Sequence, residues 1–250
     1  MLIRLLWLCL AFAIPFSGYA EMDPEDEKYY LVLGGKAYDN WMGMLSSDDI
    51  ATRGLNKADF RQNHPAYPAN GKQHGLVTWR CKECHGWDYR GAEGAYSSGS
   101  HYTGIKGIQG MRGADPQRVE AILRDSVHRF DQRMIDDPLA RAIALFVSQG
   151  QIDMASLVEP KTGKALGDAR LGRPFFNTLC AGCHGLRGRE VNFSTPKKPE
   201  YVGTLANKNP WEFLHKIRHG HPGEEMISVQ ALELQQQGDI LSYAQTLPRQ

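Results

Sequence analysis

The sequence predicts an all-α, loop-rich protein. Apolar residues recur at i, i+3 and i+4 in residues 118–124 and again in residues 211–218, which is the spacing of one face of a helix. Each stretch begins close behind a proline, a residue favoured in the first helical turn because its missing N–H is not needed there. The 26 glycines and 13 prolines exceed average usage and indicate long loops between the helices.

The length allows one large domain or two small ones, and the charge balance gives no sign of a nucleic-acid partner. The chain has 250 residues, with 29 basic and 28 acidic side chains and a formal net charge of +1. Neither sign of electrostatic field dominates, so binding to nucleic acid or another polyanion is not expected.

Residues 1–20 have the pattern of a secretory signal peptide. A basic start precedes the apolar run 5–14, and the small residues Gly18 and Ala20 stand where a signal peptidase inspects the chain. The run is shorter than the ~20 residues that span a bilayer. We expect export to the periplasm, cleavage after about Ala20, loss of Cys9 with the leader, and no membrane span in the mature chain.

The next segment, residues 21–70, is predicted to be an N-terminal helical extension. Residues 23–45 place apolar side chains on one helical face, and we expect this face to pack on the domain that follows. The side chains of this stripe are Tyr30, Leu33, Ala37, Trp41 and Met44. Residues 63–71 are rich in turn formers and are expected to cross the surface.

Two C-x-x-C-H motifs contain every cysteine of the mature chain. They read Cys81-Lys-Glu-Cys84-His85 and Cys180-Ala-Gly-Cys183-His184. This motif attaches c-type haem: the two thiols form thioethers to the porphyrin, and the histidine reaches the iron. The sequence therefore predicts two covalently bound haem c groups.

Three other interpretations of the cysteines are weaker. A zinc ribbon also uses two C-x-x-C pairs, but its pairs lie about 15–20 residues apart, whereas these stand in different halves of the chain. A thioredoxin-like redox pair needs a βαβ context, and no strand-like apolar run precedes either motif. Two local disulfides would leave both histidines unexplained.

The chain repeats one order of features after each motif. A loop is followed by a helix that starts near a proline, then by a polar turn containing a methionine, and then by a final helix. The loops are 86–113 and 185–209, the methionines Met134 and Met226, and the final helices 138–147 and 231–247. This order resembles two class I cytochrome c domains in tandem, over roughly residues 70–150 and 165–250. We expect domains at 71–155 and 165–250, with a boundary near 153–171.

The resemblance implies the iron ligands. His85 and His184 would be the proximal ligands, and Met134 and Met226 the distal ones. Neither methionine is followed by the proline that is common in the family. Other residues able to bind iron remain as alternatives, and Met111 comes too early for the family order. The alternative histidines are His128, His219 and His221.

The resemblance also implies a function. We expect a periplasmic diheme c-type cytochrome that relays single electrons between redox proteins. Its partners would be a donor dehydrogenase and an acceptor cytochrome or oxidase. We expect an electron carrier rather than an enzyme. One alternative is a diheme oxidoreductase of the thiosulfate dehydrogenase or peroxidase kind, with an open or replaceable ligand position on one iron. Another is an electron-accepting subunit of a larger dehydrogenase complex, suggested by residues 21–70.

Overall fold

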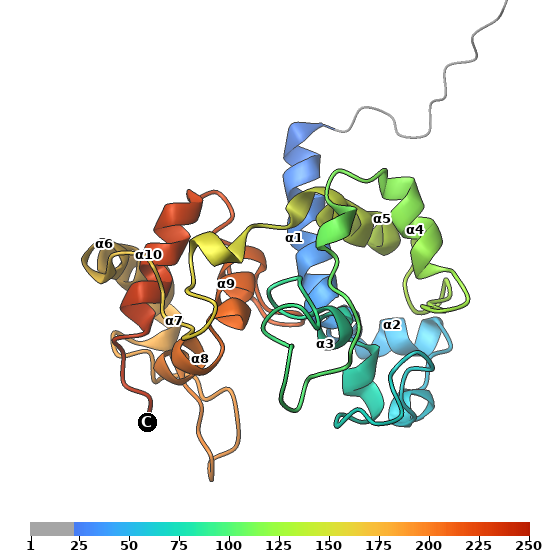
Figure 1. The fold of residues 1–250 in the computed structure, drawn as a ribbon, viewed down its shortest axis with the longest axis horizontal. Helices are drawn as coiled ribbons and strands as arrows, with labels where there is room; N and C mark the ends of the chain where they lie inside the picture. The colour runs from blue at the N-terminus through green and yellow to red at the C-terminus, as the bar shows by residue number, and fades with distance from the viewer. Residues whose placement is uncertain (1–22) are drawn as a thin grey trace, which may run out of the picture.

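The computed structural model describes residues 23–250, and the expected leader, its cleavage site and Cys9 lie outside the described residues. The chain forms two helical bodies (Figure 1), one drawn from blue to green and the other from orange to red. Apart from helices and loops, residues 23–250 contain only isolated β-bridges, which confirms the all-α class. No helix in this part of the chain is long and apolar enough to cross a membrane.

Each body contains five α-helices in the described chain. The first has α1 (Pro24–Asn40), α2 (Ser47–Thr52), α3 (Cys81–His85), α4 (Pro116–Leu123) and α5 (Asp137–Leu145). The second has α6 (Ala169–Phe175), α7 (Ala181–His184), α8 (Val202–Lys208), α9 (Pro210–His219) and α10 (Leu234–Ala244). We call these bodies unit 1 and unit 2.

Capping residues and prolines fix where the middle helices begin. Asp115 precedes Pro116 and accepts a hydrogen bond from the N–H of Gln117 at the start of α4. Asn209 precedes Pro210 and accepts one from the N–H of Glu212 at the start of α9. A side-chain oxygen at this position satisfies an N–H that the helix itself cannot bond. The equivalent starts of α4 and α9 agree with the predicted helices at 118–124 and 211–218.

In unit 1, α1 crosses α5 at very short range. A Cβ atom added to Gly34 would lie 2.0 Å from the carbonyl oxygen of Ala142, so only glycine permits this approach. Ala142 and Ile143 are fully buried at the crossing. The helix predicted at residues 23–45 thus packs on unit 1, as its apolar face indicates, and Ala37 and Trp41 of that face are almost completely buried.

In unit 2, α6 crosses α10 in the same manner. A Cβ atom on Gly172 would lie 1.8 Å from the carbonyl oxygen of Asp239. Both units therefore pair their first helix with their last through a glycine that touches a backbone carbonyl. Helix α1 lies in the expected extension 21–70 and packs on α5 of the expected first domain, and residues 41–80 connect it to α3.

The structure contains two helices that the sequence did not predict. Helix α8 lies in residues 185–209, which were expected to be a loop, and that expectation is wrong for Val202–Lys208. Helix α6 begins inside the expected boundary 153–171. Gly172 and Pro174 interrupt the helical pattern of α6, while Gly203 and the short length of α8 conceal that helix.

The two units meet where α1 faces α9. A Cβ atom on Gly35 would lie 2.2 Å from the ring of His219, which is fully buried. Adjacent glycines thus allow α1 to contact α5 through Gly34 and α9 through Gly35. In Figure 1, α1 stands between the rest of unit 1 and unit 2.

Candidate functional site

The first C-x-x-C-H motif forms the short helix α3. The helix starts after the extended residue Arg80 and ends at Gly86, whose φ of 78° lies in the left-handed region that glycine tolerates. Helix α1 and the residue after it hold the chain on both sides of α3: the Tyr38 hydroxyl donates to the Gly86 carbonyl over 2.6 Å, and the indole N–H of Trp41, just after α1, donates to the Trp79 carbonyl over 3.0 Å. The motif is therefore anchored on the first helix of its own unit.

The second motif has the same local structure. A helical turn over Phe176–Cys180 continues α6 into α7, which ends at Gly185 with φ 74° and ψ 158°. Gly86 ends α3 with φ 78° and ψ 156°. The two motifs thus place their histidines on the last turn of equivalent helices.

All four cysteines of the described chain are free thiols. Cys81, Cys84 and Cys180 are half-buried and Cys183 is exposed. Burial raises the pKa of Cys81 and of Cys84 to about 12 and that of Cys180 to about 11. Reactive redox cysteines have a lowered pKa, so this environment does not favour a thioredoxin-like pair.

His85 has the environment of an oriented metal ligand. Its Nδ1 hydrogen donates to the Lys106 carbonyl over 2.8 Å, which leaves Nε2 as the nitrogen with a lone pair. Burial lowers the pKa of His85 to about 4, although the bond to Lys106 opposes the shift. The imidazole is therefore neutral at physiological pH, the form that binds metals.

His184 is less completely satisfied. Its Nδ1 atom is buried and has no hydrogen-bond partner, and its ring lies 5.7 Å from the ring of Phe193 between centres. Burial lowers the pKa of His184, so this imidazole is also kept neutral. Phe193 is exposed beside it, as is Leu186 shortly after the motif. A neutral imidazole next to uncovered apolar side chains suits the face of a porphyrin.

The predicted distal methionines pack at the edge of the core. Met134 and Met226 are half-buried and touch the hydrophobic core of their units, as Met111 does. The N–H of Met134 donates to the Asp131 carboxylate over 3.0 Å. A methionine at such a position can serve either as an iron ligand or as a packing residue, so the roles of Met134 and Met226 stay predictions.

The three alternative histidines have different surroundings. The ring centre of His128 lies 6.2 Å from that of His85. His219, the last residue of α9, is fully buried against α1, and neither of its ring nitrogens has a hydrogen-bond partner. The Nδ1 atom of His221 lies 2.9 Å from the carbonyl oxygen of the next residue.

The residues present suit haem better than a metal ion held by protein alone. Residues 23–250 contain no group of three or more His, Cys, Asp or Glu side chains placed to hold a metal ion. A haem iron takes four ligands from its porphyrin and needs only one or two from the protein. Two free thiols beside one neutral imidazole, present twice, match that need.

A buried polar interface that no sequence pattern indicated lies next to the first motif. The Asp39 carboxylate of α1 pairs with Arg80 of its own unit and with Lys216 of α9, the latter over 2.7 Å. Burial would raise the pKa of Asp39, but the two cations outweigh it and hold the value at about 2. Asp39 and Lys216 are 177 positions apart, so no local sequence pattern could reveal the pair.

A buried histidine extends this interface. The Tyr89 hydroxyl donates to Nδ1 of His215 over 2.9 Å, and Nε2 of His215 donates to the Gly35 carbonyl over 2.8 Å. Trp87, two residues after the first motif, packs against the same imidazole with 5.2 Å between ring centres. Helix α9 of unit 2 thus lies directly against the segment that follows His85.

Comparison with known proteins adds no family to this picture. No protein-family model matches the chain, and no curated protein matches it.

Proposed function

We propose that this chain is an exported diheme c-type cytochrome that relays single electrons between redox proteins. The observation that carries the proposal is the duplication of one site: a short helix with two free thiols and a histidine, ended by a left-handed glycine, in each of two helical units. Haem attachment needs both thiols free, and the histidine directly after the second thiol reaches the iron.

The arrangement of helices around the motifs supports tandem cytochrome c domains. In each unit the first helix crosses the last helix at a glycine, and the motif helix follows the first helix in sequence. After each motif helix, a middle helix, a methionine and a final helix follow along the chain, which is the order that the resemblance implies. A covalently held haem would also supply a large apolar centre for units whose loops are long.

The chemistry of the relay is one-electron transfer. When bound, haem supplies an iron that cycles between Fe(III) and Fe(II). A donor dehydrogenase loses one electron to the cytochrome, and an acceptor cytochrome or oxidase gains one from it, so that no atoms are transferred. The chain contributes axial ligands, orients them through bonds such as that from His85 to Lys106, and excludes water from the haem, which together set the reduction potential.

Export follows from the leader pattern in residues 1–20. Haem attachment to C-x-x-C-H motifs and electron exchange with dehydrogenases are both consistent with a periplasmic protein.

The proposal is tested by redox titration of the purified protein, produced in a strain that attaches c-type haem. We expect two electrons per chain, taken up in one-electron steps, and slow or negligible binding of carbon monoxide by the reduced protein. The double variant Cys180→Ser/Cys183→Ser is expected to take up one electron, because unit 1 keeps its haem. Rapid binding of carbon monoxide by the reduced wild-type protein would contradict a pure carrier and favour an enzyme.

A further inference from the structure

His85 faces a second imidazole in unit 1. The ring centres of His85 and His128 are 6.2 Å apart, and the two ring planes differ by 21°. Two imidazoles that bind one metal ion from opposite sides have ring centres about 6 Å apart, because each nitrogen lies about 2 Å from the metal and about 1 Å from the centre of its own ring. The separation of His85 and His128 therefore equals that of a pair of axial ligands.

In both rings, Nδ1 makes a hydrogen bond within residues 23–250 and Nε2 makes none. Nδ1 of His85 donates to the Lys106 carbonyl over 2.8 Å, and Nδ1 of His128 donates to the Asp125 carboxylate over 3.2 Å. In the described chain, Nε2 of neither ring has a hydrogen-bond partner. A metal-binding histidine ordinarily uses its other ring nitrogen for such a bond, which fixes the tautomer and the ring orientation.

The backbone of His128 is held on both sides. Its N–H donates to the Asp125 carboxylate over 2.7 Å, and its carbonyl accepts from Nε2 of His64 over 2.8 Å. The next residue, Arg129, has φ 55° and is one of two non-glycine residues with positive φ among residues 23–250. Such a conformation persists only where the surroundings enforce it, and it is frequent at functional sites.

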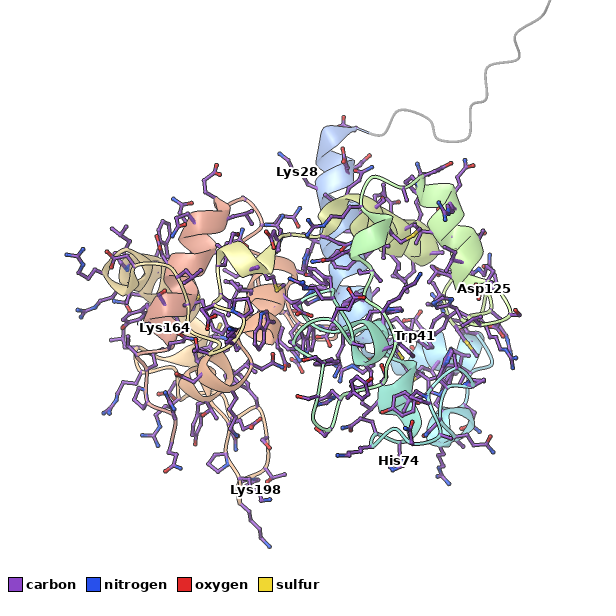
Figure 2. The ribbon with its side chains drawn as sticks, in the orientation of Figure 1. Lys28, Trp41, His74, Asp125, Lys164 and Lys198 are labelled. Atoms are coloured by element: carbon purple, nitrogen blue, oxygen red, sulfur yellow. The ribbon has the colours of Figure 1, made fainter. Side chains whose placement is uncertain are left out.

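The support for His128 comes from a segment that unit 2 does not have. His64 lies in residues 41–80, between α1 and the first motif, whereas α6 continues into the second motif through one helical turn. His64 is buried, and its ring packs 4.6 Å from that of Trp79 between centres. In Figure 2, Asp125 marks the loop after α4 that carries His128. The extra segment thus holds this loop in place.

In the described part of unit 2, no second imidazole faces the motif histidine. The aromatic ring beside His184 is that of Phe193, and Nδ1 of His221 lies next to a carbonyl of its own turn. The neighbouring imidazoles of His215 and His219 belong to α9. Met226, which the resemblance implies as the distal ligand, follows α9 and packs against the core.

From these contacts we infer that His128, and not Met134, is the second axial ligand of the haem at the first motif, while the second motif pairs His184 with Met226. This inference rests on the proposed function, because it requires haem at both motifs. Methionine ligation raises the reduction potential of a c-type haem relative to bis-histidine ligation. The two haems therefore differ in potential, and electrons pass from unit 1 to unit 2.

The test uses the weak near-infrared charge-transfer band that sulfur ligation gives to oxidised haem. We expect the wild-type protein to show this band, Met226→Leu to lose it completely, and the matched variant Met134→Leu to keep it unchanged. His128→Ala is expected to open one of the two irons, so that carbon monoxide binds to half of the reduced haem. His128→Met is expected to raise the lower of the two midpoint potentials.

The same two methionine variants also define the result that would contradict the inference. If half of the band remains in Met226→Leu and half is lost in Met134→Leu, Met134 binds the first iron and the inference is wrong. This comparison needs no His128 variant to fold. A haem count below two per chain in the wild-type protein would instead contradict the proposed function, so the two failures are distinguishable.

Discussion

At the scale of single residues, burial determines how the motif side chains behave. The same desolvation that raises the pKa of the Cys81 thiol lowers that of the His85 imidazole. Both groups are kept neutral: the thiol is a poor nucleophile, and the imidazole retains a lone pair. Such a site is unsuited to thiol redox chemistry and suited to holding a metal.

Burial of His215 predicts a pH dependence of stability. Desolvation lowers its pKa to about 4, against the opposing effects of Asp39 and the Gly35 carbonyl, whereas an unfolded histidine titrates near 6.5. The unfolded chain therefore binds a proton first as the pH falls. The contribution of His215 to stability is complete above pH ~6.5 and is lost as the pH falls to about 4, by on the order of 3 kcal/mol.

Denaturant unfolding of His215→Gln at pH 7 and pH 4.5 checks this prediction. The free energy of unfolding should fall less between these two pH values in the variant than in the wild-type protein. The exposed His74 provides the control, and His74→Gln should follow the wild-type curve. An identical pH dependence in His215→Gln and wild type would show that His215 is not buried as described.

The sequence predicts the residues of the candidate site only where they lie close together in one segment of the chain. The motif fixes the relative positions of Cys81, Cys84 and His85 because they occupy one short helix. His128 reaches the same site from another loop, 43 positions later, and depends on His64 for its place. A pattern within one segment cannot predict such a contact.

At the scale of helices, two glycines determine the architecture of the units. Gly34 and Gly172 each lie against a backbone carbonyl of the last helix of their unit, and that oxygen cannot move aside as a flexible side chain can. We expect Gly34→Ala and Gly172→Ala each to destabilise the protein by at least about 1–3 kcal/mol, the cost of overpacking.

Thermal or denaturant unfolding measures the effect of these substitutions. Gly110→Ala is a suitable control, because a Cβ atom there has no neighbour within 4 Å. Equal stability of Gly34→Ala, Gly172→Ala and Gly110→Ala would contradict the close helix crossings.

The helices differ in how far the sequence predicts them. Helices α4 and α9 were predicted because each has one apolar face and begins with a proline, and α5 and α10 because a final helix closes each half of the repeat. Helix α6 was missed because the glycine that its crossing with α10 requires lowers its apparent helix propensity. The packing of α1 on α5 joins segments about 100 residues apart, so the sequence indicated the apolar face of α1 but not its partner.

At the scale of the whole molecule, the ion pairs of Asp39 connect the two units. Lys216 is buried, and the substitution Asp39→Asn would leave its ammonium without the carboxylate. We expect this variant to lose about 3–5 kcal/mol of stability, as happens when one partner of a buried pair is removed. The two units should then unfold in separate transitions.

The pH dependence of Asp39 gives a second measure. Its folded pKa of about 2 lies below the unfolded value of ~3.9, so the pair stabilises the protein above pH ~4 and loses that effect as the pH falls through 2. The difference between wild type and Asp39→Asn should shrink over this range in calorimetric unfolding. Glu200→Gln, which breaks the exposed pair with Lys208, should change stability by at most about 1 kcal/mol.

The central claim is that each C-x-x-C-H motif holds one haem covalently. The most direct measurement is the intact mass of the denatured protein purified from a strain that attaches c-type haem. The structure and sequence together predict the mass of residues 21–250 plus two haem groups. A mass equal to that of the polypeptide alone, or of the polypeptide plus one haem, would contradict the claim.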